Sequence, residues 1–260
     1  MKGSVIRRIH LFLRQHYAYG LLVGLLLTVF GIIAGYNGHP YWLALLVGIG
    51  DSVIAAALVT LLSPATDELY QQFLALGIRE LWPSRRDVPG DNWCEWLGGA
   101  SKTCTLLGVV HGEWRNDLRF EPALRKCLGK GVDVKILFLN PNSRLAEIRA
   151  GEEQRPTPGM IKDSIKMVWD IRGRFDVDSQ QHLHLYAYDS TPSSGATWID
   201  SFMIVTHYLA GYPNRTSPAF RVHDQGGDSL FGIYRLNIER ILKKDSTIEI
   251  TEENVAQYRS

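Results

Sequence analysis

Two long apolar runs, residues 17–36 and 41–62, dominate the first part of the chain, and the turn-rich segment 37–40 separates them. Between Arg14 and Asp67 the only charged side chain is Asp51. A helix rises ~1.5 Å per residue, so a run of about 20 residues matches the ~30 Å hydrocarbon core of a bilayer. The pattern therefore predicts a transmembrane helical hairpin over residues 17–62, in preference to two buried helices.

The flanking charges predict how this hairpin is oriented. Basic residues precede the first run and follow the second, whereas the connecting turn has none: Lys2, Arg7, Arg8, Arg14, Arg79, Arg85 and Arg86. Because basic loops stay on the cytoplasmic side, we expect a two-pass protein of the inner (cytoplasmic) membrane with both termini in the cytoplasm. A cleaved signal peptide is the weaker interpretation, since a cleavage site rather than a second apolar run would follow it.

Asp51 requires an explanation because it lies near the middle of the second run. An ionised carboxylate at the bilayer centre costs at least ~2.5 kcal/mol, so we expect Asp51 to be protonated, hydrogen-bonded or facing water. One interpretation is an anchor in which Asp51 pairs with Thr28 or Ser52. The other interpretation is a homo-oligomer in which the copies place Asp51 around a water-filled pathway. Gly31 and Gly35 form a GxxxG pair, which predicts close helix contacts.

The pattern changes after the second run. Residues 1–16 are a basic arm, residues 63–82 predict a connecting helix that begins with Ser63 as its cap, and the proline-containing segment 82–92 predicts a loop. Short apolar runs then predict strands at 103–111, 132–139 and 182–188 and a strand pair over 198–209. Amphipathic segments predict helices at 121–128, from 143, at 158–172 and at 228–242. This βαβ alternation predicts an α/β domain over residues 83–260.

Composition narrows the function. The chain has 28 Lys and Arg against 27 Asp and Glu. It therefore lacks the basic excess of a protein that binds nucleic acid non-specifically through the backbone phosphates. No pair of its three cysteines has CxxC spacing, which favours reduced thiols, and a zinc site with His111 fits no common ligand pattern: Cys94, Cys104 and Cys127. His182 and His184 fit the wet face of a strand better than a metal site. We therefore expect no metal and no other cofactor.

Candidate site residues follow the predicted strands, because ligands of α/β sheets bind beyond the carboxyl ends of the strands. Candidate acids and bases are His111, Glu113, Asp200 and His207, and candidate ligand-binding residues are Asn140, Asn142, Ser143 and Asn214. A helix that begins after Ser143 could hold a phosphate at its amino end. Simple capping of that helix is the plainer explanation of Ser143.

Residues 121–143, EPALRKCLGKGVDVKILFLNPNS, resemble the helix and strand of the phospholipase-D-like fold. Residues 77–85 and 198–209 resemble the flanking segments of bacterial two-helix membrane-anchored proteins with such a domain. Active members of that superfamily use a His-x-Lys pair with an Asp four residues further on, and this chain has no such motif. The resemblance implies a site that keeps only Asp200, without the usual phosphodiesterase activity but with a phosphate-sized cleft.

These observations lead to three hypotheses. The first is a membrane-anchored sensor and effector whose cytosolic domain binds a phosphate-containing signal, such as a nucleotide, and alters hairpin assembly in bacterial antiviral or stress defence. The second is a membrane-bound phosphodiesterase, nuclease or lipid hydrolase with a non-standard site. The third is an interaction domain that recruits partners.

Overall fold

The computed structural model describes residues 19, 21–38, 40–115, 117–155, 157–226 and 229–259. The chain divides into two compact units, residues 1–73 and residues 74–260. The predicted basic arm, residues 1–16, lies outside the described residues.

The first unit is a helical hairpin. Residues 21–36 are helical, a turn at Asn37 and Gly38 follows, and α2 extends over Pro40–Ala75. Gly38 has a φ of 84°, a left-handed conformation in which glycine ends helices without strain. The two helices approach closely at their glycines, since a Cβ on Gly50 would lie 2.2 Å from Thr28 Oγ1. The close helix contacts expected from the sequence are therefore present within the chain.

None of the helices that the structure describes combines the length and the apolar character that a bilayer crossing requires. The predicted two-pass location in the inner membrane is therefore wrong, and the predicted transmembrane hairpin has no support. That prediction rested on the length of the runs and on the scarcity of charge. In the structure, α2 includes the charged Asp51 and continues beyond the second run to Ala75.

Asp51 lies exposed on α2. The hydroxyl groups of Thr28 and Ser52 donate to the carbonyl oxygens of Gly24 (3.0 Å) and Gly48 (2.8 Å), each within its own helix. A hydroxyl has one proton to donate, so neither Thr28 nor Ser52 donates to Asp51 as the anchor interpretation expected.

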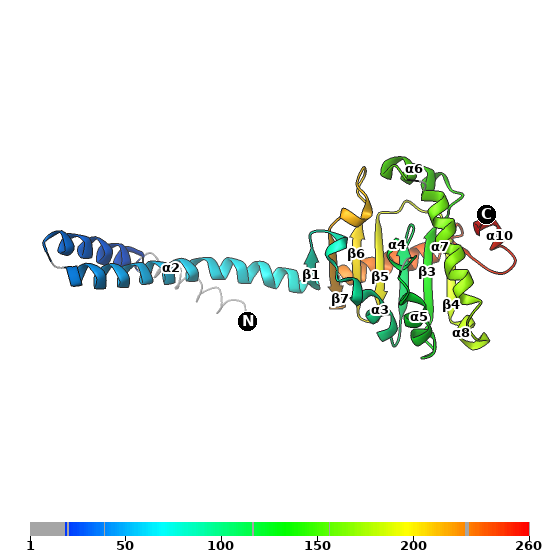
Figure 1. Ribbon diagram of the computed structural model, residues 1–260, viewed down its shortest axis with the longest axis horizontal. Coiled ribbons are helices and arrows are strands. Elements are labelled where there is room, and N and C mark those ends of the chain that lie inside the picture. The colour runs from blue at the N-terminus through cyan, green and yellow to red at the C-terminus, as the bar shows by residue number, and fades with distance from the viewer. Residues whose placement is uncertain are drawn as a thin grey trace. The chain divides into compact units, whose positions relative to one another are not determined.

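The second unit contains an eight-stranded sheet with the order β1-β7-β6-β5-β2-β3-β4-β8 (Figure 1). The strands are β1 (Ile78–Trp82), β2 (Cys104–Gly108), β3 (Val134–Leu139), β4 (Leu183–Tyr188), β5 (Ser194–Ile199), β6 (Phe202–His207), β7 (Ala219–His223) and β8 (Ile248–Glu249). β2, β3 and β4 are parallel, whereas the remaining pairings are antiparallel. The pairing directions leave β1, β6, β2, β3 and β4 running the same way, so their carboxyl ends meet at one edge.

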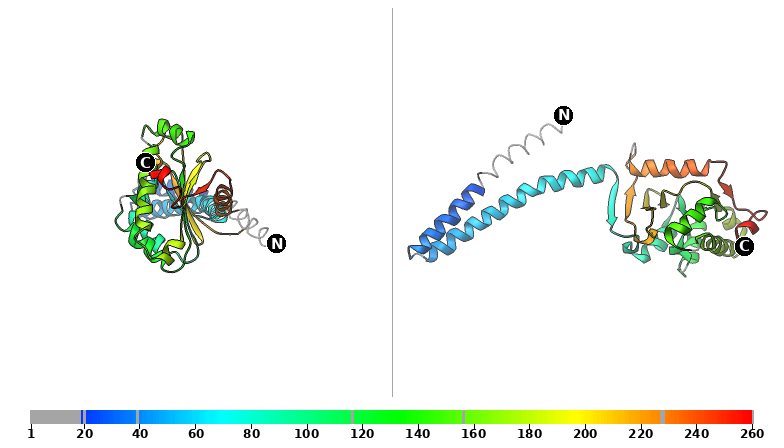
Figure 2. Two further views of the ribbon diagram at one scale, coloured as in Figure 1. Left: turned by 90° about the vertical axis from the view of Figure 1, so that its right-hand side faces the viewer. Right: turned by 90° about the horizontal axis from the view of Figure 1, so that it is seen from above.

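Helices cover both faces of this sheet. α3 (Gly90–Gly99), α5 (Phe120–Leu128) and α7 (Thr157–Arg172) lie on one face and α9 (Leu230–Leu242) on the other, as Figures 1 and 2 show together. Shorter elements complete the unit: η1 (Arg85–Asp87), α4 (Gly112–Arg115), α6 (Arg144–Glu153), α8 (Val177–Gln181), η2 (Asn214–Thr216) and α10 (Ala256–Arg259). The buried core lies between these layers, where β2 and β3 are covered on both faces.

The predicted mixed α/β architecture is confirmed. The predicted strand, helix and strand over residues 103–139 correspond to β2, α5 and β3, with β2 and β3 parallel. The loop predicted over residues 82–92 instead includes η1 and the start of α3. Tyr188, at the end of β4, is buried and only 1% exposed.

Candidate functional site

A cavity of about 550 Å³ opens at the edge where the carboxyl ends of β1, β2 and β6 meet. Residues that follow each of these strands line it, together with residues from the junction of α6 and α7. Its volume lies in the usual range for small-molecule sites, roughly 300–1,000 Å³. The lining includes five arginines, Arg85, Arg86, Arg119, Arg155 and Arg215, and three carboxylates, Glu113, Asp117 and Glu153.

His111 fixes the loop that follows β2. It has a φ of 52°, and its ring packs so close to Gly108 that a Cβ there would lie 2.8 Å from the ring. Its Nε2 lies 2.9 Å from the carbonyl oxygen of Leu137 and donates to it, because a carbonyl only accepts. Burial lowers the pKa of His111, so the neutral imidazole is the resting form.

Tyr208 closes the wall at the end of β6. Its hydroxyl oxygen accepts a hydrogen bond from the backbone N–H of Val109, with 3.0 Å between the two atoms. The guanidinium carbon of the buried Arg149 lies 5.1 Å from the centre of the Tyr208 ring, and Arg149 also pairs with Glu152 and Glu153. Burial raises the pKa of Tyr208 to about 12, so its phenol stays protonated at neutral pH. Tyr208 and Arg149 therefore connect the ends of β6, β2 and α6 behind the cavity.

Two of the lining arginines are neutralised by carboxylates. Arg85 pairs with Glu113 and lies over the ring of Trp93, 5.3 Å from its centre. Arg119 pairs with Asp117 (Nη2 to Oδ2, 2.8 Å) and with Asp91. Arg85 therefore links η1 to α4 and to α3, and Arg119 links α3 to the segment that precedes α5. The charges of both arginines are satisfied within the chain.

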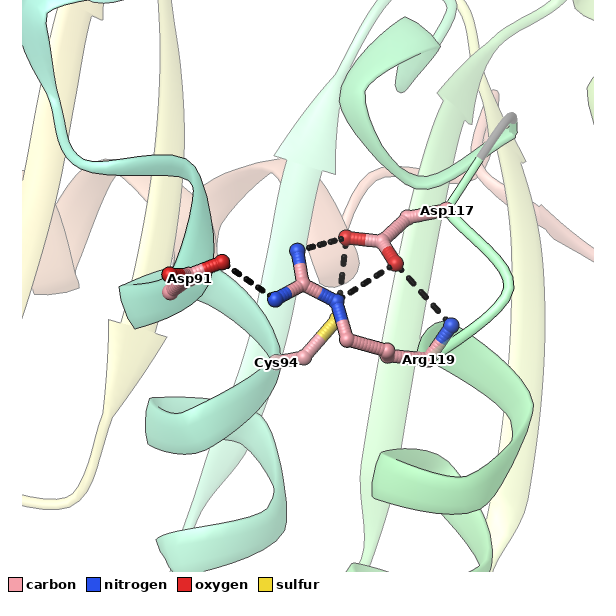
Figure 3. Close-up of polar contacts among 4 residues, drawn as sticks. All are labelled: Asp91, Cys94, Asp117 and Arg119. Atoms are coloured by element: carbon pink, nitrogen blue, oxygen red, sulfur yellow. Dashed lines mark hydrogen bonds and ion pairs between the residues drawn. The ribbon is translucent and has the colours of Figure 1, made fainter.

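Figure 3 shows the Arg119 cluster, in which Asp117 also accepts from the thiol of Cys94 at 3.5 Å. The hydrogen bond from Arg119 is the main reason why the pKa of Asp117 is lowered to about 2. Burial, followed by the charge of Asp117, raises the pKa of Cys94 to about 11. Cys94 is therefore an inert thiol rather than a nucleophile for the cavity.

The other three arginines, Arg86, Arg155 and Arg215, differ from the paired ones. Their guanidinium groups have no hydrogen-bond or ion-pair partner among the described residues, although all three line the same cavity. They come from three separate segments: η1, the α6–α7 junction and η2. Repulsion, first from Arg86 and then also from Arg155, lowers the pKa of Arg215. The cavity therefore has a concentrated, uncompensated positive charge.

Two further features of the cavity lining have polar groups without a partner in the described part of the chain. α7 begins at Thr157, which lines the cavity together with Met160, so the amino end of a 16-residue helix adjoins the arginines. Such an end carries partial positive charge. The side-chain oxygen of Asn214 is buried and has no hydrogen-bond partner within the described chain.

The structure brings only part of the predicted site together. His111, Glu113 and Asn214 line the cavity. Asn140, Asn142 and Ser143 instead organise the turn after β3: the Asn140 side chain accepts from the Asn142 N–H (3.0 Å), and Ser143 caps α6 through Ala146 N–H. Those three residues do not line the cavity.

Asp200 and His207 lie away from the cavity as well. Asp200 follows β5 at the opposite edge of the sheet, where it accepts hydrogen bonds from the N–H groups of Ser101, Lys102 and Thr103. His207 is exposed, and its Nε2 lies 3.1 Å from the hydroxyl of Tyr234. These candidate acids and bases therefore do not converge on one reacting centre.

The histidines and cysteines considered as metal ligands have other partners. His182 and His184 lie 2.6 Å and 2.9 Å from the carboxylates of Asp133 and Glu249. In the described ranges, no three His, Cys, Asp or Glu side chains gather into a cluster suited to a metal ion. The three free cysteines are buried.

Sequence reasoning missed the three unpaired arginines. In the sequence, Arg86 only indicates the orientation of the hairpin, and nothing in the pattern around Arg155 or Arg215 predicts a site. One signal was present: Arg85 and Arg86 directly follow the segment 78–82, which is β1. Recognition of that strand would have placed both arginines at the carboxyl edge of the sheet.

No protein-family model and no curated protein sequence matches the chain. Among solved structures, TrmBL2, an archaeal chromatin protein described with a novel mode of DNA binding, is 17% identical, with a TM-score of 0.37 over 78% of this chain and 67% of its own. Phosphatidylserine synthase of Haemophilus influenzae Rd KW20 is 10% identical, with a TM-score of 0.43 over 65% of this chain and 37% of its own. These TM-scores are too low to carry an argument, so the phospholipase-D-like resemblance stays a prediction.

Proposed function

We propose that the unit formed by residues 74–260 binds a small molecule that contains phosphate, in the cavity at the carboxyl edge of the sheet. The observation that carries the proposal is the set of three arginines, Arg86, Arg155 and Arg215, that line this cavity without a carboxylate partner among the described residues. Arginine presents a planar fork of donors that matches phosphate oxygens, and bidentate pairs of this kind are strong.

The energetics of the cavity support an anionic ligand. Arg86 and, to a smaller extent, Arg155 repel Arg215, as the lowered pKa of Arg215 indicates. An anion would relieve this repulsion and would gain hydrogen bonds from three segments at once. The neighbouring arginines, Arg85 and Arg119, are already neutralised and have less to gain from an anion.

Binding without hydrolysis is the activity that these residues favour. The chain lacks a His-x-Lys pair, and His111 is neutral with one ring nitrogen donating to Leu137. A general base would have to lie within hydrogen-bond reach of the reacting proton. Of the other candidates, Glu113 lines the cavity but is paired with Arg85, and Asp200 and His207 are not among the cavity residues.

We further propose that ligand binding changes self-association of the chain, as expected for a sensor. Many large apolar side chains of the hairpin are exposed in one copy of the chain, among them Leu22, Leu25, Phe30, Leu45 and Ile49. Apolar surface on this scale commonly marks a protein interface. Mass photometry with and without ligand tests this part: a ligand-dependent change in mass supports it, and an unchanged mass contradicts it.

Isothermal titration calorimetry with inorganic pyrophosphate tests the binding proposal. We expect the full chain to bind pyrophosphate, and we expect each of Arg86→Gln, Arg155→Gln and Arg215→Gln to weaken binding about tenfold, through lost charge-assisted hydrogen bonds. The matched control is Arg240→Gln, because Arg240 is exposed on α9, on the other face of the sheet. Absence of binding, or equal binding by all four variants and the wild type, would contradict the proposal.

A further inference from the structure

The geometry points to a narrower ligand class: we infer that the cavity takes an organic di- or triphosphate with a free terminal phosphate, such as a nucleoside 5′-triphosphate, rather than a phosphodiester. This inference rests on the proposed function and specifies its ligand. It follows from the number of unpaired cations, from their origin in separate segments and from the apolar side chains that line another part of the cavity.

The charge of the site sets the charge of the ligand. Arg86, Arg155 and Arg215 together bring three positive charges with no carboxylate partner among the described residues. A phosphodiester carries one negative charge and would leave two of them uncompensated. A terminal phosphate carries about 1.5 to 2 negative charges at neutral pH, and each further phosphate of a chain adds about one more. A di- or triphosphate therefore matches the site, whereas a diester does not.

The positions of the donors favour the same ligand. The arginines belong to η1, to the α6–α7 junction and to η2, three separate segments that all line the cavity. A hydrogen bond of 2.8 Å from Ser84 Oγ to the carbonyl oxygen of Arg215 ties the first and last of these segments together. A terminal phosphate offers three non-bridging oxygens, one for each fork, whereas a diester offers two.

The remainder of the cavity accommodates an organic group. The volume of about 550 Å³ is much larger than a phosphate chain requires, and Val88, Trp93, Leu107 and Met160 contribute apolar lining. The buried side-chain oxygen of Asn214 has no hydrogen-bond partner within the described chain. Because an unsatisfied buried acceptor is costly, a ligand N–H or O–H that reaches Asn214 would gain affinity. A nucleoside supplies such donors on its base and its ribose.

Calorimetry with a graded ligand series tests the inference. The full chain is titrated with adenosine 5′-triphosphate, diphosphate and monophosphate, with cyclic adenosine monophosphate and with tripolyphosphate, all in EDTA so that no metal masks the charge. We expect affinity to fall about tenfold with each phosphate removed, and the cyclic diester to bind weakest of the phosphate ligands. Arg215→Lys keeps the charge but loses the planar fork of donors. Its affinity for adenosine triphosphate should therefore lie between those of the wild type and Arg215→Gln.

The variant Asn214→Ala distinguishes the contribution of the organic group to affinity from that of the phosphate chain. We expect this variant to lose several-fold affinity for adenosine triphosphate while its affinity for tripolyphosphate stays at the wild-type value. Equal loss for both ligands would show that Asn214 supports the fold rather than the organic group, and would overturn that part of the inference.

The outcomes distinguish this inference from the proposed function. If the cyclic monophosphate binds as tightly as the triphosphate, and the arginine variants weaken both, the cavity is a phosphate site and the inferred ligand class is wrong. If no member of the series binds, and pyrophosphate does not bind either, the proposed function itself fails.

Discussion

The two edges of the sheet in residues 74–260 use charged side chains in opposite ways. At the edge beyond β5, the carboxylate of Asp200 accepts hydrogen bonds from three backbone N–H groups and from the hydroxyl of Ser101, at 2.7 to 3.0 Å. At the carboxyl edge, Arg86, Arg155 and Arg215 line a cavity without partners among the described residues. A charge that the chain satisfies builds the fold, whereas a charge that it leaves unsatisfied is available to a ligand.

The arginines within the cavity also fall into two groups, those paired with carboxylates and those without a partner among the described residues. Arg85 and Arg119 pair with carboxylates, and Arg85 stacks on Trp93. Their removal should act mainly on the fold, through α3 and the segments around it. Removal of Arg86, Arg155 or Arg215 should act mainly on ligand affinity.

The largest expected effect on the fold is at Asp200. Asp200→Ala removes the acceptor for the N–H groups of residues 101–103, and hydrogen bonds to a charged group contribute about 1.5–3 kcal/mol each in favourable cases. We expect urea unfolding to show a free energy of unfolding that is lower by about 2–3 kcal/mol, since hydrogen bonds to water replace part of those that Asp200 accepted. Asp189→Ala is the control, because Asp189 is exposed. Equal stability of both variants would show that the Asp200 cluster contributes nothing to folding.

A smaller effect of Asp200 depends on pH. Burial alone would raise its pKa, but the hydrogen bonds from Thr103, Lys102 and Ser101 outweigh burial and lower it. A carboxyl whose pKa is lower in the folded state stabilises above its unfolded pKa, about 4, and loses this contribution as the pH falls through the folded value. The stability advantage of the wild type over Asp200→Asn should therefore decrease as the pH falls below about 4. Unfolding curves that stay parallel across this range would contradict the assignment.

A still smaller effect, on the melting temperature of the ligand-free protein, is expected at the carboxyl edge of the sheet. Arg215→Gln removes one of three mutually repelling cations, so the ligand-free variant should melt slightly above the wild type, by about 1 °C. Raising the salt concentration should reduce the difference, because salt screens exposed charges. Differential scanning calorimetry measures the difference in melting temperature and its dependence on salt. A lower melting temperature at low salt would show that Arg215 has a stabilising partner in the fold.

The smallest expected effect concerns the paired cluster around Arg119. Asp117→Asn removes the negative charge that helps to raise the pKa of Cys94, so thiolate becomes more accessible. Alkylation of Cys94 by iodoacetamide at pH 8 should become about threefold faster, because the thiolate is the nucleophile. Peptide mass spectrometry follows Cys94, with the buried Cys104 as the internal reference. Parallel acceleration at Cys104 would indicate general loosening instead.

Periodic segments could be predicted from the sequence, and the reason is physical. β2, α5, β3, α7 and α9 carry apolar residues at the spacing of their own structure and bury them in one core. β1 carries exposed residues at Arg79, Glu80 and Leu81, so it lacks the apolar run of a central strand. β1, α3 and β7 were not predicted, whereas the antiparallel pair of β5 and β6 corresponds in part to the strand pair predicted over residues 198–209.

The hairpin shows how far composition alone can mislead. Its two runs were interpreted by length and by lack of charge, and the predicted bilayer crossing was wrong. The glycines were the better guide, because the close approach predicted from Gly31 and Gly35 is present at both, and Gly24 and Gly50 show it as well.

The candidate site was predicted in position but not in chemistry. The rule that ligands bind beyond the carboxyl ends of strands located His111 and Glu113 correctly. It could not separate Glu113, which is paired, from Arg86, Arg155 and Arg215, which are not, because pairing depends on distances between segments far apart in the chain. Asp200 was selected for its charge, and only its hydrogen bonds reveal its structural role.

A structure of the full chain with adenosine triphosphate bound, determined in the absence of divalent metal, tests the central claim most directly. The account predicts that the terminal phosphate lies within hydrogen-bond distance of the guanidinium groups of Arg86, Arg155 and Arg215, with Arg85 and Arg119 still paired to Glu113 and Asp117. A nucleotide bound outside this cavity, or one whose phosphates displace Glu113 or Asp117 while the three unpaired arginines stay free, would contradict it.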